Sequence, residues 1–337
     1  MTKGRLTHRQ IERQKKIQAE RLARAKQSQT QTPDKVSGLS PEQPGLLVAH
    51  YGTTLIVENQ EGQLFPCVLR QNLGTLVTGD DVIWQPIDED TGIVVACLPR
   101  RSVITKPHKH GTKPVVANVD RMVVVLALAP IPQPTTIDRY LIMAHLLNLP
   151  LTIVINKWDL AKKPEHFELE DRLSAYRQLG YTAIKVSSKT KLGLDELADS
   201  LKDHASIFVG QSGVGKSSLL RALIPDAEVH IQTLSHGERL GRQTTTASRL
   251  YHLPGGGNLI DSPGIHQFKI QHFTEANILA GYPEFSPYLG LCQFRNCEHS
   301  KEPGCALLEA VRQNKIPFFR LENYHALLAD RLNNPRS

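Results

Sequence analysis

The sequence predicts an α/β protein with a doubly wound parallel sheet, a small five-stranded barrel before it and a helical, metal-binding region after it. Three observations predict this class. Short alternating segments fill residues 45–99, apolar strand patterns alternate with helical patterns across residues 122–260, and thiol and imidazole side chains cluster near the C-terminus. Alternation of strands with helices is typical of a parallel sheet covered on both faces.

The bulk composition is that of a folded protein. The 337 residues suffice for two or three domains, and 40% apolar with 22% charged residues excludes disorder throughout the chain. The longest apolar stretch, residues 122–132, is too short to span a bilayer, and the N-terminal segment lacks the apolar core of a secretory signal. We therefore expect a cytoplasmic protein without membrane association.

Residues 1–44 are predicted to be a basic tail and a linker. Residues 1–26 contain nine Lys or Arg against two Glu, so their formal charge of +7 equals that of the whole chain. Residues 27–44 are rich in Ser, Thr, Gln and Pro, which is typical of linkers. The charge favours contact with phosphates, although a solvated tail without a partner is the alternative.

Residues 45–103 are predicted to form a barrel of the OB type. Five segments with alternating apolar side chains are separated by turn signals such as Glu61-Gly62 and Gly79-Asp80. An OB barrel has five short strands, but an SH3-like fold or a passive spacer would give the same pattern. The basic connector at residues 106–113 slightly favours nucleic-acid binding.

Residues 104–270 are predicted to contain the parallel sheet. Residues 122–129 are a continuous apolar run, as expected of a buried parallel strand, and residues 136–148 have helical spacing. Polar motifs follow several strands, at the edge where such sheets bind ligands. The other expected strands are residues 151–155, 183–186, 207–209, 249–253 and 258–260, and the other expected helices are residues 170–179, 194–201 and 216–223.

A glycine-rich phosphate loop precedes the last of these helices. Backbone N–H groups of such a loop point at a phosphate, and the helix N-terminus adds the positive end of its dipole. Lys216 is expected to reach the β- and γ-phosphates and to act in catalysis, while the Ser217 hydroxyl ligates Mg²⁺. The predicted phosphate-binding residues are Gly210, Gln211, Ser212, Gly213, Val214, Gly215, Lys216, Ser217 and Ser218.

A second motif, residues 156–159, is expected to select the nucleobase. The Asp159 carboxylate can accept hydrogen bonds from N1–H and the exocyclic amine of guanine, which adenine does not present in that arrangement. Asn156 is expected to brace the loop, and backbone N–H groups near Ser188 are expected to contact guanine O6. The predicted guanine-binding residues are Asn156, Lys157, Trp158, Asp159, Ser187, Ser188 and Lys189.

These two motifs stand in an inverted order. An ordinary small GTPase has the phosphate loop first and the base-reading loop last, whereas here residues 156–159 precede residues 210–217. All parts of one GTP site are present but cyclically shifted. The chain is therefore predicted to be a circularly permuted P-loop GTPase that hydrolyses GTP to GDP and phosphate.

Two candidate switch segments follow the phosphate loop. Asp261 is expected near Mg²⁺, and the Gly264 N–H is expected to sense the γ-phosphate. Thr244 and Thr245 are expected beside the nucleotide. One of Thr244, Thr245 and Thr246 should complete the magnesium shell, and Thr245 is the favoured candidate. Ile265 replaces the usual water-positioning Gln, so intrinsic hydrolysis should be slow. Gln243 is our catalytic candidate, and the other side chains that could orient water or neutralise charge are His236, Arg239, Arg242 and His266.

A thiol and imidazole cluster near the C-terminus has the spacing C-x4-C-x-H-x5-C. Four such ligands close a tetrahedral Zn²⁺ shell without room for water, so the site is predicted to be structural. Free cysteines that cluster by chance are the alternative. Residues 306–330 have helical periodicity, and the metal is expected to pin a helical domain over residues 271–337. The predicted zinc ligands are Cys292, Cys297, His299 and Cys305.

With this motif order, the barrel and the cluster, residues 45–330 resemble the ribosome small-subunit-dependent GTPase A family of bacteria. The phrases GQSGVGKSSL, TTTASRLYHLP, IDSPG and CxxxxCxHxxxxxC carry the resemblance. It implies an OB fold, one Zn²⁺ and a permuted GTPase domain that binds GTP with Mg²⁺. It further implies a factor that binds 16S rRNA late in 30S maturation, hydrolyses GTP when the subunit stimulates it, and then leaves. We also expect the protein to be a monomer. The family commonly has His where this chain has Gln243, which puts the hydrolytic mechanism in question.

Two other functions fit part of the pattern. A tRNA-modification or translation-factor GTPase would respond to tRNA or 50S particles in place of 30S subunits. A non-enzymatic rRNA-binding scaffold would hold nucleotide, and no ribosomal particle would change its turnover. Steady-state GTP hydrolysis with and without each particle separates the three hypotheses.

Overall fold

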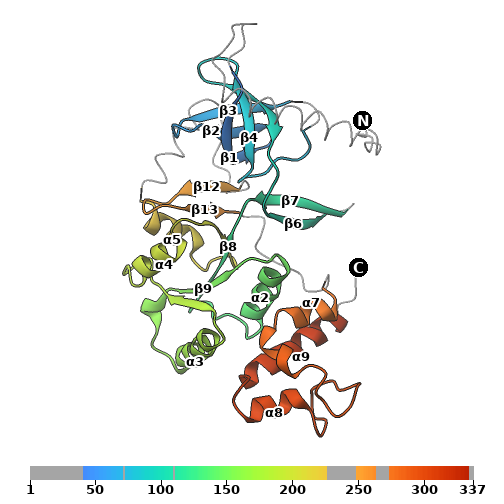
Figure 1. Cartoon of the computed structure of the whole chain (residues 1–337). Coiled ribbons are helices and arrows are strands. Elements are labelled where there is room, and N and C mark those ends of the chain that lie inside the picture. The colour runs from blue at the N-terminus through green and yellow to red at the C-terminus, as the bar shows by residue number, and fades with distance from the viewer. Residues whose placement is uncertain (1–40, 71–72, 109–110, 226–247, 263–272, 334–337) are drawn as a thin grey trace. The chain divides into compact units, whose positions relative to one another are not determined.

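The structure is a computed structural model in which two compact units are distinguished (Figure 1). The residues that it describes are 41–70, 73–108, 111–225, 248–262 and 273–333. Within them, the first unit comprises residues 41–119, 248–252 and 258–262, and the second comprises residues 120–225, 253–257 and 273–333. No helix in the described ranges is long and apolar enough to cross a membrane.

The first unit contains a closed five-stranded barrel. Its strand order is β1-β2-β3-β5-β4, and β4 pairs back onto β1. Trp84 is fully buried in the barrel core, where it packs at 4.6 Å from the ring of Phe65. The five strands predicted from the alternating segments are confirmed as β1 (Gln43–Tyr51), β2 (Thr54–Glu58), β3 (Leu64–Leu69), β4 (Asp81–Pro86) and β5 (Gly92–Cys97).

A two-stranded antiparallel ribbon, β6 (Val103–His108) with β7 (Gly111–Ala117), follows the barrel. The sequence predicts only a basic connector here. Prolines are rare inside strands, and one proline in each strand conceals the strand pattern. Ile104 and Val116 are buried at the base of the ribbon, and Lys106 stands directly opposite Lys113.

The first unit also holds the hairpin of β12 (Arg249–His252) and β13 (Asn258–Asp261), which pair antiparallel. Both strands are predicted from the sequence. β12 pairs with β1, and His252 Nε2 lies 2.6 Å from Glu58 Oε2 on β2. The Arg249 guanidinium lies 4.9 Å from the centre of the Tyr51 ring. Contacts with two barrel strands therefore hold this hairpin.

The second unit is built on a parallel sheet with the order β10-β9-β8-β11. Every residue of β9 is buried, as expected of a strand covered on both faces. The strands are β8 (Arg121–Ala127), β9 (Leu151–Asn156), β10 (Thr182–Lys185) and β11 (Ala205–Val209). The helices are α2 (Thr136–Leu146), the short η1 (Trp158–Leu160), α3 (Pro164–Gln178), α4 (Leu194–Leu201) and α5 (Lys216–Leu223).

The predicted start of one helix is wrong. Residues 170–179 are expected to be helical, but α3 already begins at Pro164. Proline suits the first position of a helix because the N–H that it lacks has no partner there. Phe167 is 60% exposed and Glu168 is also exposed, so the first turns of α3 lack a clear apolar face and give little periodic signal.

The C-terminal helices pack against the sheet's own helix α2. Ile142 of α2 belongs to the same core as Tyr282, Phe285, Leu307 and Tyr324. The predicted helical region is confirmed, and its elements are α7 (Glu275–Ala280), the 3₁₀ segment η3 (Pro283–Tyr288), α8 (Ala306–Arg312) and α9 (Phe318–Asn333). α2 is therefore shared between the parallel sheet and the C-terminal core.

Candidate nucleotide-binding site

The phosphate loop connects β11 to α5, in the strand-loop-helix setting that the motif predicts. Gly210 has a φ of +143°, and a Cβ there would lie 2.1 Å from the carbonyl oxygen of Val125 on β8. Gly213 and Gly215 have φ values of +80° and +95°. A side chain would be strained at all three positions, which explains the glycine content of the loop.

Lys216 begins α5 and is only 8% exposed. Its ammonium donates hydrogen bonds to the carbonyl oxygens of Gly210 and Gln211, both at 2.8 Å. The loop's own backbone thus holds a positive charge beside the helix N-terminus. Ser217 and Ser218 are exposed in the first turn of α5. This combination of helix N-terminus and lysine suits an anion such as a phosphate.

Asn156 and Lys157 join the base-reading loop to the phosphate loop. Asn156 Nδ2 donates to the carbonyl oxygen of Val214 at 3.0 Å, and its Oδ1 accepts the backbone N–H of Lys157 at 2.8 Å. Lys157 Nζ donates to the carbonyl oxygens of Gly213 at 2.8 Å and Ala129 at 2.6 Å. The two motifs, over fifty residues apart in the chain, therefore form one contiguous structure.

Asp159 is linked to the segment that follows β10. Ser187 Oγ donates to Asp159 Oδ1 at 2.7 Å and accepts the backbone N–H of Thr190 at 3.1 Å. Lys185 Nζ lies 5.0 Å from the centre of the Trp158 ring. Ser188 N–H lies 3.4 Å from Asn156 Oδ1. The structure thus brings the predicted base-reading segments together.

The candidate switch residues are only partly covered. Asp261 ends β13 in the first unit, and the adjacent Ser262 Oγ lies 2.7 Å from Ser248 Oγ. Lys189 is exposed beyond Ser188. The remaining predicted switch and catalytic residues lie outside the described residues, and they are His236, Arg239, Arg242, Gln243, Thr244, Thr245, Thr246, Gly264, Ile265 and His266.

The four predicted zinc ligands come together between η3 and the start of α8. One ligand atom from each residue, three thiol sulfurs and one imidazole nitrogen, lies within 4.8 Å of the others. A tetrahedral shell with Zn–S bonds of about 2.3 Å needs ligand atoms roughly 3.8 Å apart, so this donor set fits Zn²⁺. His325 Nε2 lies 3.1 Å from the carbonyl oxygen of His299 and ties the cluster to α9.

A buried polar network that the sequence pattern does not indicate surrounds Asp138 on α2. Asp138 accepts a hydrogen bond from Asn323 at 2.7 Å and forms an ion pair with Arg320. Both partners lie on α9, far from α2 in the sequence. A lone Asp in the first turn of a predicted helix is common, because it favours the helix dipole. No local pattern indicates a partner more than 180 residues away.

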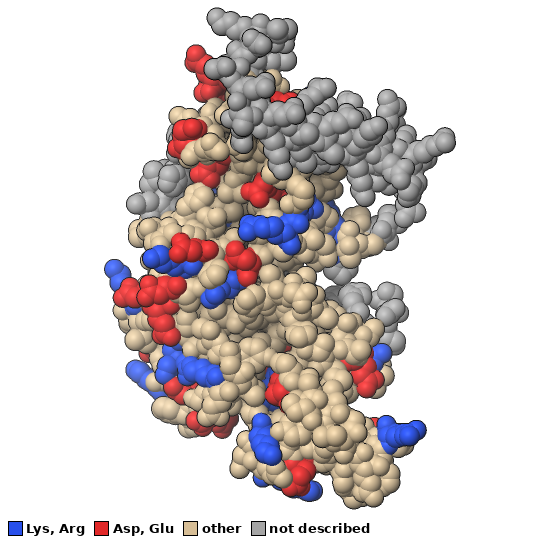
Figure 2. All heavy atoms as spheres, in the orientation of Figure 1, with Lys and Arg blue, Asp and Glu red and all other residues tan. Residues whose placement is uncertain are grey.

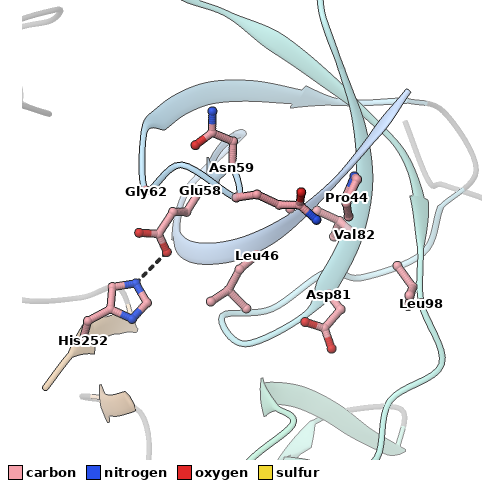
Figure 3. Close-up of a pocket in the computed structure, with 11 residues that line it drawn as sticks. Pro44, Leu46, Glu58, Asn59, Gly62, Asp81, Val82, Leu98 and His252 are labelled. Carbon is pink, nitrogen blue, oxygen red and sulfur yellow. Dashed lines mark hydrogen bonds and ion pairs between the residues drawn. The ribbon is translucent and has the colours of Figure 1, made fainter. Parts of the chain in front are cut away.

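A hollow with a volume of about 460 Å³ lies on the barrel of the first unit (Figure 3). Leu46, Asp81 and Val82 line it, and the hydrogen-bonded pair of Glu58 and His252 closes one side. The lining combines carboxylates and amides with apolar side chains and lacks lysine and arginine. This hollow therefore lacks the cations that bind phosphates.

Similarity to known proteins covers nearly the whole chain. A model of the RsgA GTPase family matches residues 97–271. The chain is 46% identical over 332 residues to the small ribosomal subunit biogenesis GTPase RsgA of Pseudomonas aeruginosa strain LESB58, which covers 98% of both chains. It is 45% identical over 331 residues to the protein of the same name from Hahella chejuensis, covering 96% of this chain and 95% of that one.

Two solved structures share the fold. The crystal structure of YjeQ from Thermotoga maritima has a TM-score of 0.68 and 31% identity, and it covers 87% of this chain and 100% of that one. The structure of YloQ, a circularly permuted GTPase, has a TM-score of 0.65 and 25% identity, with 90% and 100% coverage. The predicted permuted GTPase fold is thereby confirmed. The chain belongs to the RsgA GTPase family.

Proposed function

We propose that this GTPase acts in late maturation of the 30S ribosomal subunit, where the subunit stimulates hydrolysis and the protein then leaves. The relatives named as small ribosomal subunit biogenesis GTPases support this proposal. One structural observation carries the guanine-nucleotide part. Asn156 and Lys157 bond directly to the phosphate loop, so a base-reading loop and a phosphate-binding loop border one site.

Each part of the site has a proposed role. Asp159 accepts hydrogen bonds from N1–H and the exocyclic amine of guanine, with Ser187 holding one of its oxygens. Lys216 contacts the β- and γ-phosphates and neutralises charge that develops during transfer. Ser217 and Thr245 would ligate Mg²⁺, which polarises the phosphates when GTP is bound. The other proposed contributors are Gln243 for orienting water, Thr244, Asp261, and the Gly264 N–H at the γ-phosphate.

We assign Zn²⁺ to the cluster of Cys292, Cys297, His299 and Cys305, since four donors of this type close a shell without water. The assigned role is structural. Cys305 is the N-cap of α8, and Cys292 Sγ accepts the N–H of Ala306 at 3.4 Å. A bound metal would therefore fix the start of α8 relative to the preceding segment.

The proposed contact with 16S rRNA is assigned to the basic ribbon and tail. Like charges directly opposite each other destabilise a strand pair, yet Lys106 faces Lys113 across the ribbon. Both lysines are exposed, so their ammonium groups can contact the phosphates of an RNA backbone. The barrel is less suitable, because residues 41–99 contain eight Asp or Glu and only one Arg. Acidic side chains are visible over the barrel in Figure 2.

Steady-state GTP hydrolysis with 30S, 50S, 70S or no particles tests the proposal. Stimulation of at least tenfold by 30S subunits, with little effect of 50S, is expected of a small-subunit maturation factor. Gln243→Ala should lower the stimulated kcat more than it weakens nucleotide binding. Equal turnover under all four conditions would contradict the proposal and favour a nucleotide-holding scaffold. We propose that the protein acts in the cytoplasm as a monomer, and sedimentation of the purified chain tests the monomeric state.

A further inference from the structure

Asp138 is a fully buried carboxylate where α2 meets the C-terminal helices. Four side chains from three later parts of the chain donate hydrogen bonds to it. Tyr176 of α3 donates at 2.5 Å, Asn323 of α9 at 2.7 Å and Tyr282 at 3.2 Å, and Arg320 of α9 completes the set with an ion pair. One carboxylate therefore fixes the positions of α2, α3 and α9 together. Figure 1 shows α2 beside α7 and α9.

Arg320 is as fully buried as Asp138, and several contacts hold its guanidinium in place. Besides Asp138, its guanidinium donates to Glu284 at 2.6 Å and to the carbonyl oxygen of Gly281 at 3.1 Å. Its central carbon lies 4.1 Å from the centre of the Tyr282 ring. Burial opposes the charge, but the neighbouring Asp138 carboxylate keeps the pKa of Arg320 well above its usual range. Removal of one partner of such a buried pair is strongly destabilising, because it leaves the other charge buried without compensation.

The same network reaches the loop between β8 and α2, residues 128–135. Asn323 Nδ2 donates to the carbonyl oxygen of Pro134 at 3.0 Å. Near the other end of the loop, the carbonyl oxygen of Ala129 accepts Lys157 Nζ at 2.6 Å, and Leu128 N–H donates to the Asn156 carbonyl oxygen at 3.2 Å. α9 and the base-reading loop thus hold the two ends of one short loop.

We infer that Asn323, held by Asp138, is a positioning residue for guanine recognition that acts through the loop of residues 128–135 on Lys157. The inference rests on the proposed base-reading role of residues 156–159. Lys157 also bonds to Gly213 of the phosphate loop, so a shift of the 128–135 loop would disturb the link between the two halves of the site. The C-terminal helices would then contribute to nucleotide selectivity as well as to their own fold.

Asn323→Ala tests this inference, with dissociation constants for GDP and for inosine diphosphate as the readout. Inosine lacks the exocyclic amine. The Kd for inosine diphosphate divided by the Kd for GDP therefore reports how well Asp159 is placed to accept a hydrogen bond from that amine. Loss of the Pro134 contact should lower this ratio by about three- to tenfold. If Asn323 acts on stability alone, its substitution would weaken the binding of both nucleotides equally. An unchanged ratio would therefore overturn the inference.

Asp330→Asn is the matched control. Asp330 lies on the same helix and pairs with Arg139 of α2 at 2.7 Å, but this contact does not involve the loop of residues 128–135. The control should keep the wild-type ratio. If it lowers the ratio as much as Asn323→Ala does, the effect comes from loosening α9 in general and the inference is wrong.

A measurement on the wild-type chain covers the case in which Asn323→Ala does not fold. Coupling between two sites is reciprocal, so GDP binding should slow amide hydrogen exchange in α9. Pyrophosphate, which has no base, should not. Equal protection by both ligands, or by neither, would count against the inference.

The failure of this inference differs from the failure of the proposed site. If Asp159→Asn leaves base preference unchanged, residues 156–159 do not read the base and the proposed site itself is wrong. If Asp159→Asn changes base preference while Asn323→Ala keeps the wild-type ratio, only the positioning role of Asn323 is wrong.

Discussion

At the residue scale, Asp159 is the side chain that we propose selects the base. One of its oxygens already accepts the Ser187 hydroxyl at 2.7 Å, which orients the carboxylate. Asp159→Asn replaces an acceptor with an N–H donor, which suits the C2 carbonyl of xanthine better than the amine of guanine. We expect GDP affinity to fall by about 10- to 100-fold and xanthosine diphosphate to bind better than GDP.

Competition between the two nucleotides for the purified variant measures this change. Asp171→Asn on α3 is a suitable control, because it removes an exposed carboxylate outside the site. An Asp159→Asn protein that still prefers GDP would remove this residue from the proposed site.

Gly215 is the glycine at which the phosphate loop meets the base-reading loop. A Cβ there would lie 2.3 Å from Asn156 Nδ2, and the φ of +95° disfavours any other residue. Gly215→Ala should therefore displace Asn156 and lower the free energy of unfolding by about 1–3 kcal/mol, with a loss of GDP affinity.

Gly180→Ala separates the two causes. Gly180 has a similar φ of +90°, but a Cβ there meets nothing within 4 Å. Denaturant unfolding of both variants should show the larger loss for Gly215→Ala. Equal losses would mean that backbone strain alone destabilises both variants, and that the Asn156 side chain moves aside at little cost in free energy.

At the scale of elements, His252 connects the hairpin of β12 and β13 to the barrel. Its Nδ1 lies 2.7 Å from Asn258 Oδ1 and its Nε2 lies 2.6 Å from Glu58 Oε2, so two acceptors favour the doubly protonated ring. The hydrogen bond to Glu58 raises the pKa of His252 above its usual value, against the opposing effect of burial.

The raised pKa of His252 determines how its contribution to stability changes with pH. The contribution to stability is fully present below the unfolded-state pKa of about 6.5 and is lost as pH rises through the higher folded-state pKa. His252→Gln should therefore lower Tm more at pH 5.5 than at pH 8.5. Thermal unfolding of both proteins at the two pH values checks this. Glu58→Gln should reduce the pH dependence in the same way, and equal effects at both pH values would contradict the prediction.

The metal cluster makes a prediction about the C-terminal helices. We expect about one Zn²⁺ per purified chain, and its removal by a chelator should reduce helical content because the start of α8 loses its fixed point. Elemental analysis with far-UV circular dichroism measures both quantities. Cys297→Ser should abolish stoichiometric zinc, whereas Cys97→Ser in the barrel should retain it. A Cys297→Ser protein with a full zinc content would show that the cluster is not the site.

The elements differ in how far the sequence could predict them. The phosphate loop was predictable because the positive φ values at Gly210, Gly213 and Gly215 are a local requirement of the backbone, which a short stretch of sequence contains in full. The ribbon was not, since proline interrupts the alternation in both of its strands. The Asp138 network was also hidden, because burial and partners 182 and 185 residues away are tertiary properties that no local window contains.

At the scale of the whole molecule, the charge is divided unevenly along the chain. Residues 1–26 carry a formal charge of +7, and the remaining residues sum to zero. The barrel is acidic, so it repels phosphates at long range. We therefore assign the proposed sequence-independent attraction to rRNA to the tail and to local basic features such as Lys106 and Lys113 of the ribbon.

Deletion of residues 2–26 tests this division of charge. Each phosphate contact that is lost should reduce the slope of log affinity against log salt by about 0.7 to 0.9, so the shortened chain should bind 30S subunits more weakly and with a flatter salt dependence. Its intrinsic GTP hydrolysis should stay unchanged, because the phosphate loop and the base-reading loop are intact. Binding titrations between 50 and 200 mM salt, roughly the range over which such contacts are screened, measure the slope. A shortened chain with the wild-type slope would mean that the tail makes no phosphate contacts, and that the ribbon and specific contacts alone hold the subunit.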